Sequence, residues 1–254
     1  MAGTNVSVVI GAGSGIGRAI ATNLAGASAH VVVADREPDA AAAVAAEVGG
    51  TAVTIDVTDE AQVEALFSTA AGLGPVTGVV NSAGVSTLSA VVDHDVADFR
   101  RVVDTCLTGS MIVLKHGGRA VADGGALVTI ASLNARQAGT GMAAYCSAKA
   151  GVAMLTEVAA LELAPRGIRV NAVSPGLVVT PLTQPAMDIP GIRESYLENT
   201  PLGRSGEPEE IAALVRFLLS GEARWITGEN VDINGGAHLA RYPDLLGLVT
   251  KAFA

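Results

Sequence analysis

The sequence contains few cysteines, no clustered histidines and no long apolar run. Its two cysteines, Cys106 and Cys146, lie far apart without a C-x-x-C spacing, which argues against a disulfide framework and favours a reducing, cytoplasmic location. The histidines are scattered, so we predict no metal site. No apolar run approaches the roughly 20 residues that span a bilayer, and the first residues lack the basic and apolar regions of a secretion signal.

Positive charge is also scarce, because the 254 residues carry a formal net charge of −9. Nucleic-acid binders are usually basic, and no basic cluster suggests an anionic membrane, so neither partner is expected. Aromatic residues make up 3% of the chain although half of it is hydrophobic. Alanine, valine, glycine and leucine must therefore fill a core in which helices pack tightly on a sheet.

Short apolar runs alternate with helix-length segments along the whole chain. Continuous apolar runs such as "VSVVI" indicate strands buried on both faces, and the intervening helices imply a parallel sheet with right-handed crossovers. We therefore predict one α/β domain over residues 1–254, a doubly wound, mostly parallel sheet of about seven strands with helices on both faces. Strands are expected at 6–10, 30–35, 52–57, 76–84 with its turn, 126–132, 169–176 and 229–235. Helices are expected at 17–27, 37–49, 59–74, about 95–118, about 143–164 and 208–220.

The first predicted strand runs directly into a glycine-rich turn, "GAGSGIG", at residues 11–17. Glycine lets the backbone approach a pyrophosphate closely, and the following helix offers unpaired N–H groups and a positive dipole end. The turn therefore predicts a dinucleotide site, against the alternative of a tight strand–helix turn without a ligand.

Asp35 ends the second predicted strand, at the distance where dinucleotide folds place an acid that binds the adenosine ribose. A carboxylate there would repel a 2′-phosphate, which favours NAD over NADP. Arg36 complicates this prediction, since an arginine could face that phosphate. The alternative for Asp35 is a solvated acid at a strand end.

Tyr145 and Lys149 stand four residues apart in "AAYCSAKAG", so both lie on one face of the predicted helix. A free phenol ionises near pH 10, and a neighbouring ammonium favours the phenolate. The pair could therefore exchange a proton with a substrate oxygen. By itself, the spacing is equally typical of an ordinary surface pair.

Together these motifs resemble the short-chain dehydrogenase/reductase family over nearly the whole chain. The match covers the glycine turn, "VNSAG" at 80–84, Ser132 placed 13 residues before Tyr145, the Tyr-x-x-x-Lys pair, "NAVSPGLVVTP" and the C-terminal "PLGRSGEPEEIA" and "ITGENVDINGG". The resemblance implies NAD-dependent interconversion of a secondary alcohol and a ketone. Tyr145 would be the general acid/base, Lys149 would assist it and hold the nicotinamide ribose, and Ser132 would bind the substrate oxygen.

The resemblance also implies the cofactor contacts. Asp56 and Val57 match the pair near the adenine, and the segment at 175–180 matches the one beside the nicotinamide. The expected cofactor residues are Gly11, Gly13, Ser14, Gly15, Ile16, Gly17, Asp35, Asp56, Val57, Asn81, Ala83, Gly84, Tyr145, Lys149, Pro175, Gly176, Val178 and Thr180. For Asp56, a helix cap is the alternative, and for 175–176 a plain turn.

Two positions depart from the family pattern. Cys106 stands where the family often has a catalytic asparagine, whose backbone carbonyl holds a water in a proton relay to the lysine. A backbone carbonyl survives the substitution, so we expect the reaction class to be kept, with Cys106 as a small packing residue. Ile10 precedes the first glycine, where threonine is common in the family.

Residues 181–200 correspond to the segment that covers the substrate in this family. They could line an apolar pocket or pack as a small helix, and we lean towards an apolar alcohol or ketone. The side chains concerned are Leu182, Met187, Ile189, Ile192, Tyr196 and Leu197, while Arg136 and Arg193 could meet a charged substrate. The resemblance further implies a homotetramer. A catalytically weak dinucleotide sensor is the alternative function, and an epimerase or dehydratase would need a larger C-terminal domain.

Overall fold

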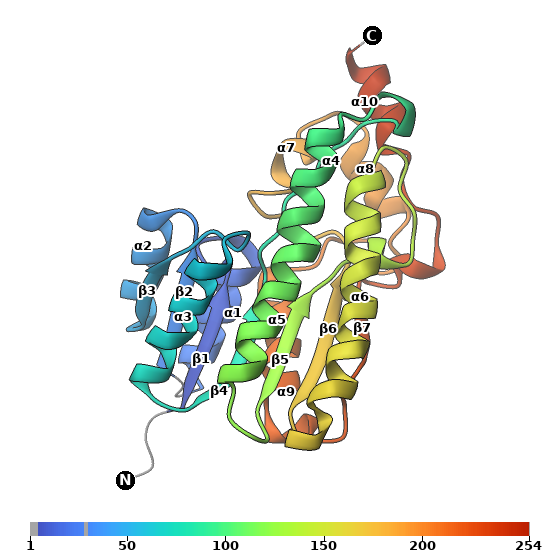
Figure 1. Cartoon of the computed structure of the whole chain (residues 1–254). Helices are drawn as coiled ribbons and strands as arrows, with labels where there is room; N and C mark the ends of the chain where they lie inside the picture. The colour runs from blue at the N-terminus through green and yellow to red at the C-terminus, as the bar shows by residue number, and fades with distance from the viewer. Residues whose placement is uncertain (1–4, 28–29, 254) are drawn as a thin grey trace.

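A sheet of seven parallel strands forms the centre of the molecule (Figure 1). The structure is a computed structural model that describes residues 5–27 and 30–253. The strand order is β3-β2-β1-β4-β5-β6-β7, so the order reverses between β1 and β4. The strands are β1 (Val6–Ile10), β2 (His30–Asp35), β3 (Thr51–Thr54), β4 (Val76–Asn81), β5 (Ala126–Ile130), β6 (Arg169–Pro175) and β7 (Asn230–Ile233).

Each central strand is buried on both faces because its successive side chains enter two different cores. In β1, Val6, Val8 and Ile10 join one core cluster, whereas Val9 joins the other. The first cluster is completed by α3, α5 and α6, and the second by α1, α2 and α9. The expected doubly wound α/β fold is therefore confirmed, and the continuous apolar runs follow from helices on both faces.

The helices begin and end near the expected positions. Asp59 caps α3 by accepting hydrogen bonds from the backbone N–H groups of Ala61 and Gln62, and prolines open α2 and α9. The bounds of the major helices are α1 (Gly15–Ala25), α2 (Pro38–Val48), α3 (Glu60–Leu73), α4 (Val96–Val103), α5 (Gly109–Ala120), α6 (Ala143–Leu163) and α9 (Pro208–Leu219).

The structure differs from the expected elements in three places. The helix predicted at about 95–118 is α4 followed by a π-helical segment, Asp104–Thr108, and then α5. The strand predicted at 52–57 ends at Thr54, because the chain turns there towards the cap of α3. A helix near the C-terminus, α10 (Leu245–Phe253), was not predicted.

Residues 181–200 contain two short helices, α7 (Gln184–Met187) and α8 (Ile192–Glu198). Together with α10 they lie beyond the end of the sheet at which the strands terminate (Figure 1). Leu245 of α10 packs there with Met187, Ile192 and Met142. These short elements are formed by long-range apolar contacts, which is why local periodicity did not predict them.

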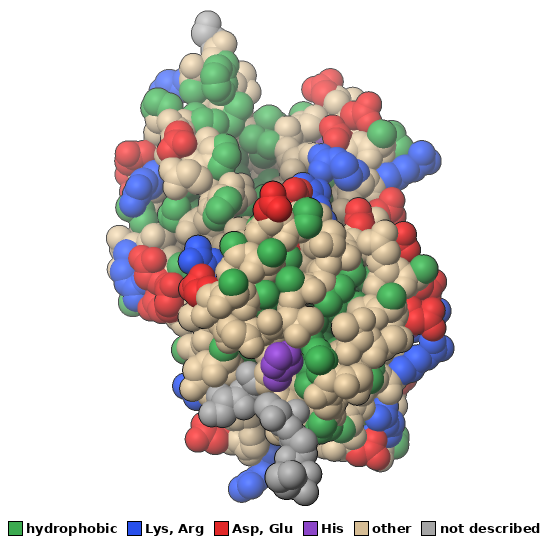
Figure 2. Space-filling model, turned by 90° about the vertical axis from the view of Figure 1, so that its left-hand side faces the viewer, with side chains coloured by type: hydrophobic (Ala, Val, Ile, Leu, Met, Phe, Trp, Pro, Cys, Tyr) green, Lys and Arg blue, Asp and Glu red, His purple; other side chains and the backbone are tan. Residues whose placement is uncertain are grey.

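Seen from the side of β3 and α2, the surface is hollowed at the same end of the molecule (Figure 2). Hydrophobic side chains lie within this hollow, while acidic and basic side chains occupy the raised parts on either side (Figure 2). In open α/β sheets, ligands bind beyond the carboxyl ends of the strands, where the strand order reverses. The fold therefore places the predicted glycine turn and Ser132 at one crevice.

Candidate active site

A cavity of about 370 Å³ opens at the carboxyl ends of β1, β2 and β4, where the predicted cofactor residues gather. Of the expected cofactor contacts, the structure leaves only Gly13 and Asn81 out of its lining. The lining residues that were predicted are Gly11, Ser14, Gly15, Ile16, Gly17, Asp35, Asp56, Val57, Ala83, Gly84, Tyr145, Lys149, Pro175, Gly176, Val178 and Thr180. The cavity is also lined by residues that were not among the expected cofactor contacts, including Arg36, Ser82, Thr105 and Thr183.

The glycine turn is packed so closely that two of its glycines, Gly11 and Gly17, leave no room for a Cβ atom. Gly11 has a φ of +73°, and a Cβ there would lie 2.7 Å from the backbone nitrogen of Ala83. A Cβ on Gly17 would overlap the carbonyl oxygen of Gly11. The α1 helix begins at Gly15, so its first N–H groups and positive dipole end face the cavity. This bare backbone fits a pyrophosphate.

The carboxylate of Asp35 is held at the cavity wall by two backbone donors. Its Oδ2 accepts from the N–H of Gly13 at 2.8 Å, and its Oδ1 accepts from the N–H of Glu37 at 3.0 Å. Gly13 thus supports Asp35 rather than lining the cavity. Arg36 also lines the cavity, but its exposed guanidinium lies 3.2 Å from the Glu37 carboxylate.

Asp56 and Asn81 are both engaged in local hydrogen bonds. The backbone N–H of Thr58, followed by its hydroxyl, holds the pKa of the Asp56 carboxyl below its usual range. Asn81 is buried, its Nδ2 donates to Ser110 at 3.0 Å, and its Oδ1 accepts from the N–H of Ala83 at 3.2 Å. Asn81 therefore stabilises the turn after β4 without lining the cavity, whereas Ala83 lines it.

Ser132, Tyr145 and Lys149 lie together where this cavity meets a second one. Ser132 and Tyr145 line both cavities, and Lys149 lines the first. The Lys149 side chain is buried, its Nζ donates to the carbonyl oxygen of Ile130 at 2.7 Å, and the same atom lies 5.6 Å from the centre of the Tyr145 ring. The sequence spacing that predicted this group thus corresponds to one site.

The second cavity has a volume of about 300 Å³ and mostly apolar walls. Leu182, Met187 and Tyr196 of the covering segment line it as expected, whereas Ile189 and Leu197 do not, and Ile192 packs within a core cluster. Sequence analysis missed the side chains that the structure adds from the loop after β5 and from the C-terminal region. The polar ones are Asn134, Gln137, Arg241 and Tyr242.

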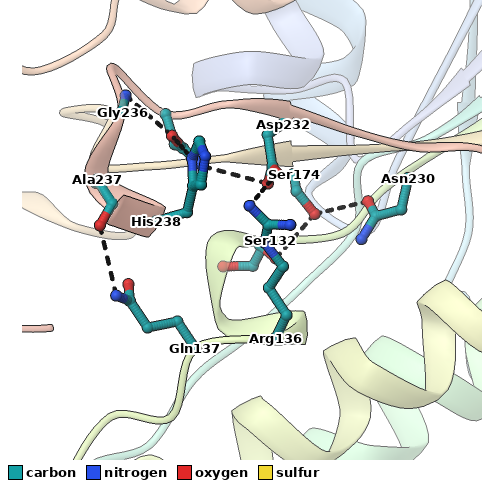
Figure 3. Close-up of polar contacts among 10 residues, drawn as sticks. Ser132, Arg136, Gln137, Ser174, Asn230, Asp232, Gly236, Ala237 and His238 are labelled. Atoms are coloured by element: carbon teal, nitrogen blue, oxygen red, sulfur yellow. Dashed lines mark hydrogen bonds and ion pairs between the residues drawn. The ribbon is translucent and has the colours of Figure 1, made fainter. Parts of the chain in front are cut away.

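The loop that carries Ser132 is tied to the C-terminal region by polar contacts (Figure 3). Ser174 of β6 donates to the carbonyl oxygen of Ser132 at 2.9 Å. Arg136 forms an ion pair with Asp232 of β7 at 2.6 Å, and Nε2 of Gln137 donates to the carbonyl oxygen of Ala240 at 2.8 Å. Arg136, a candidate for a charged substrate, is therefore already paired. Arg193 does not line either of the two cavities.

Cys106 lies in the π-helical segment and is fully buried. Its thiol contacts the backbone of Val85, with Sγ 3.3 Å from the carbonyl oxygen and 3.5 Å from the nitrogen. Its own carbonyl oxygen accepts from the hydroxyl of Ser110 at 2.6 Å. The Cys106 side chain therefore fills a buried site next to the Val85 backbone. The hydroxyl of Ser110 is a hydrogen-bond partner of the Cys106 carbonyl oxygen.

Two negative findings concern the described part of the chain. Within residues 5–27 and 30–253, no helix is long and apolar enough to cross a membrane. Across the same residues, no group of three or more His, Cys, Asp or Glu side chains is arranged to hold a metal ion.

Comparison with known proteins gives the same family over almost the full length. A family model described as Enoyl-(Acyl carrier protein) reductase matches residues 11–238. Galactitol 2-dehydrogenase (L-tagatose-forming) of Cereibacter sphaeroides is 38% identical over 91% of this chain and 93% of its own. Meso-2,3-butanediol dehydrogenase of Serratia marcescens is 36% identical, over 91% of this chain and 94% of its own.

Among solved structures, a short-chain type dehydrogenase/reductase from Mycobacterium ulcerans superimposes with a TM-score of 0.94. It is 32% identical and the match covers 100% of this chain and 97% of that one. The parallel sheet, the glycine turn at its switch point and the Ser132–Tyr145–Lys149 group thus occur in a chain that is similar to these proteins over almost its whole length. The protein is a member of the short-chain dehydrogenase/reductase family.

Proposed function

We propose that this protein is an NAD(H)-dependent dehydrogenase that interconverts a secondary alcohol and a ketone. The observation that carries the proposal is the junction of the two cavities. Ser132 and Tyr145 line both of them, and the buried Lys149 lies beside the tyrosine. A hydroxyl or carbonyl group held at that junction would be within reach of the cofactor cavity and of an acid/base at once.

The proposal of NAD rests on the carboxylate of Asp35. Its two backbone donors fix it at the cavity wall with lone pairs left to accept hydrogen bonds from ribose hydroxyls. A 2′-phosphate would face that negative charge, and the nearby Arg36 is drawn towards Glu37. When bound, the nicotinamide would supply the hydride acceptor or donor, and the glycine turn and the start of α1 would hold its pyrophosphate.

Each of the three side chains would then have one task. Tyr145 in its phenolate form takes the proton of the alcohol during oxidation, and in its phenol form it returns that proton during reduction. The Lys149 ammonium donates one hydrogen to the carbonyl oxygen of Ile130 and has two more to donate to the cofactor ribose and to water. The Ser132 hydroxyl hydrogen-bonds the substrate oxygen and stabilises its developing charge.

The second cavity supports a small alcohol or ketone as the substrate. Several relatives of this chain are named for small alcohols, among them galactitol, meso-2,3-butanediol and, in Mycolicibacterium smegmatis, D-threitol. The walls of the cavity here are mainly apolar, and three of its polar side chains, Asn134, Tyr242 and Tyr196, are connected to Ser132 by successive hydrogen bonds. We therefore propose a substrate with an apolar body, oriented by few polar contacts.

Turnover of NADH with a panel of ketones, and of NAD with the matching alcohols, tests the proposal. Tyr145→Phe removes only the hydroxyl, and general acid/base groups contribute about 10²- to 10⁴-fold, so kcat should fall by about that factor. Tyr196→Phe removes a hydroxyl from the wall of the substrate cavity and serves as the comparison, with a far smaller loss expected. Full activity of Tyr145→Phe would refute the tyrosine mechanism.

The alternative is a catalytically weak dinucleotide-binding sensor. In that case the protein would bind NADH, but the panel would show no turnover that depends on Tyr145. The expectations of a homotetramer and a cytoplasmic location stay predictions, which sedimentation of the purified protein and cell fractionation can test.

A further inference from the structure

A chain of hydrogen bonds leads from the substrate-covering segment to the hydroxyl of Ser132. The hydroxyl of Tyr196 on α8 lies 2.9 Å from the hydroxyl of Tyr242, in the loop before α10. The Tyr242 hydroxyl donates to Oδ1 of Asn134 at 3.1 Å, and the Ser132 hydroxyl lies 3.4 Å from the same Oδ1. The two phenol rings meet edge to face with centroids 5.8 Å apart.

The donor and the acceptor of each hydrogen bond in this series can be assigned. Asn134 donates from Nδ2 to the carbonyl oxygen of Gln137 at 3.0 Å, so its Oδ1 must face Tyr242 and Ser132. An amide oxygen only accepts, so the Tyr242 proton goes to Asn134 and the Tyr196 proton goes to Tyr242. Burial raises the pKa of both phenols, which keeps their protons in place at neutral pH.

Asn134 also holds Ser132 directly. The backbone N–H of Asn134 donates to the Ser132 Oγ at 3.1 Å, so the serine proton has to point elsewhere. Within the described residues, Asn134 Oδ1 is the acceptor that lies within hydrogen-bond distance of that proton. During catalysis the same proton must turn to the substrate oxygen, and a buried amide oxygen left without a donor is costly.

We propose that Tyr242 is a positioning residue for Ser132: by donating to Asn134 Oδ1, it keeps that oxygen satisfied and frees the serine hydroxyl to bind the substrate oxygen. The bond from Tyr242 is the shorter of the two that reach Oδ1, 3.1 Å against 3.4 Å from Ser132. The loop that carries Tyr242 is in turn fixed by Gln137, whose Nε2 donates to the carbonyl oxygen of Ala240 at 2.8 Å and also contacts the carbonyl oxygen of Ala237 (Figure 3). The C-terminal region thus acts on the reaction through Asn134.

The kinetic test is a double-mutant cycle between Tyr242→Phe and Ser132→Ala, and it rests on the proposed function. Tyr242→Phe should lower kcat by about 5- to 10-fold, the value of one hydrogen bond. In the Ser132→Ala background, the same substitution should change kcat by less than about twofold, since it has no serine left to act through. Losses that multiply would overturn the proposal in favour of direct substrate contact or packing.

Tyr196→Phe provides the matched comparison, because Tyr196 donates to Tyr242 and not to Asn134. Its loss of kcat should be clearly smaller than that of Tyr242→Phe. Equal losses would mean that the tyrosine pair acts by closing the pocket, contrary to the proposal.

Crystal structures of the wild type and of Tyr242→Phe decide the same question without turnover. Without the Tyr242 hydroxyl, the Ser132 hydroxyl should donate its hydrogen bond to Asn134. The distance from Ser132 Oγ to Asn134 Oδ1 should then shorten from 3.4 Å towards about 2.8 Å. An unchanged distance would overturn the positioning role even if activity fell. If the wild type shows no turnover with either nicotinamide cofactor, the proposed function fails, and the two structures still decide the role of Tyr242.

Discussion

Replacing Asp35 with asparagine should weaken the preference for NADH over NADPH. The carboxylate is fixed by Gly13 and Glu37, and we assume a separation of roughly 5 Å between it and the 2′-phosphate of a ribose bound to it. Two unit charges at that distance repel by about 3 kcal/mol at an effective dielectric constant near 20, and salt lowers this value. We take about 2–3 kcal/mol, which corresponds to a change of about 30- to 150-fold in the ratio of the two dissociation constants.

The assay is a fluorescence titration of wild type and Asp35→Asn with NADH and with NADPH at one ionic strength. Asparagine offers one oxygen to two backbone donors, so NADH affinity itself should also fall, and the ratio is therefore the readout. Asp39→Asn is the matched control, since it removes the same charge from an exposed position at the start of α2 outside the cavity. The reasoning about Asp35 is refuted if the wild type binds NADPH as tightly as NADH, or if the two variants give the same ratio.

Three further outcomes follow from the geometry. Gly17→Ala should reduce the affinity for NADH at least about tenfold, because its Cβ would overlap the Gly11 carbonyl. Gly72→Ala, which has open space around it, should bind NADH as the wild type does. Equal NADH affinities of the two variants would contradict the tight turn. Leu66→Ala, at a fully buried position, should lower the free energy of unfolding by about 2–5 kcal/mol in urea denaturation, and a loss below about 1 kcal/mol would show that the core can collapse around it. Hydrogen bonds from Arg204, then from the Glu207 N–H, lower the pKa of Glu210 to about 2, so this carboxylate stabilises the fold above about pH 4.5 and stops doing so as the pH falls towards 2. Glu210→Gln should therefore reduce the loss of unfolding free energy between pH 7 and pH 2.5, measured by denaturation at pH 2.5, 3.5 and 7. An unchanged pH dependence would show that the ion pair is fully screened.

The strands and the reaction centre were predictable because their signals are local. A run such as residues 6–10 is apolar at every position since both faces of β1 are covered, and the glycine turn follows it directly. Tyr145 and Lys149 were predicted from their spacing on one helix and Ser132 from the family resemblance, and all three line the same cavity. The contacts of Asp35 and Asn81 were less predictable, because each satisfies backbone donors that sequence patterns do not reveal.

The substrate side could not be predicted in the same way, because its residues come from segments far apart in the chain. The α10 helix was missed, and so was Tyr242, which lies 108 residues from Asn134 along the sequence although their side chains are hydrogen-bonded. Nothing local distinguishes that tyrosine from any other in a loop. Its surroundings exist only after α8, the C-terminal loop and the loop after β5 have packed together.

This difference has a consequence for how the protein could change its substrate. The proposed catalytic groups are held by strands of the central sheet, with Lys149 donating to the Ile130 carbonyl of β5 and the Ser132 carbonyl accepting from Ser174 of β6. The walls of the second cavity include residues of α7, α8 and the C-terminal loop, and no residue of these three segments lines the cofactor cavity. Substitutions at Met187 or Leu245 should therefore alter KM between ketones of different size while kcat for the best substrate is largely kept. If such substitutions instead lowered kcat equally for every ketone, the covering segment would be positioning the reacting groups themselves, as we propose for Tyr242.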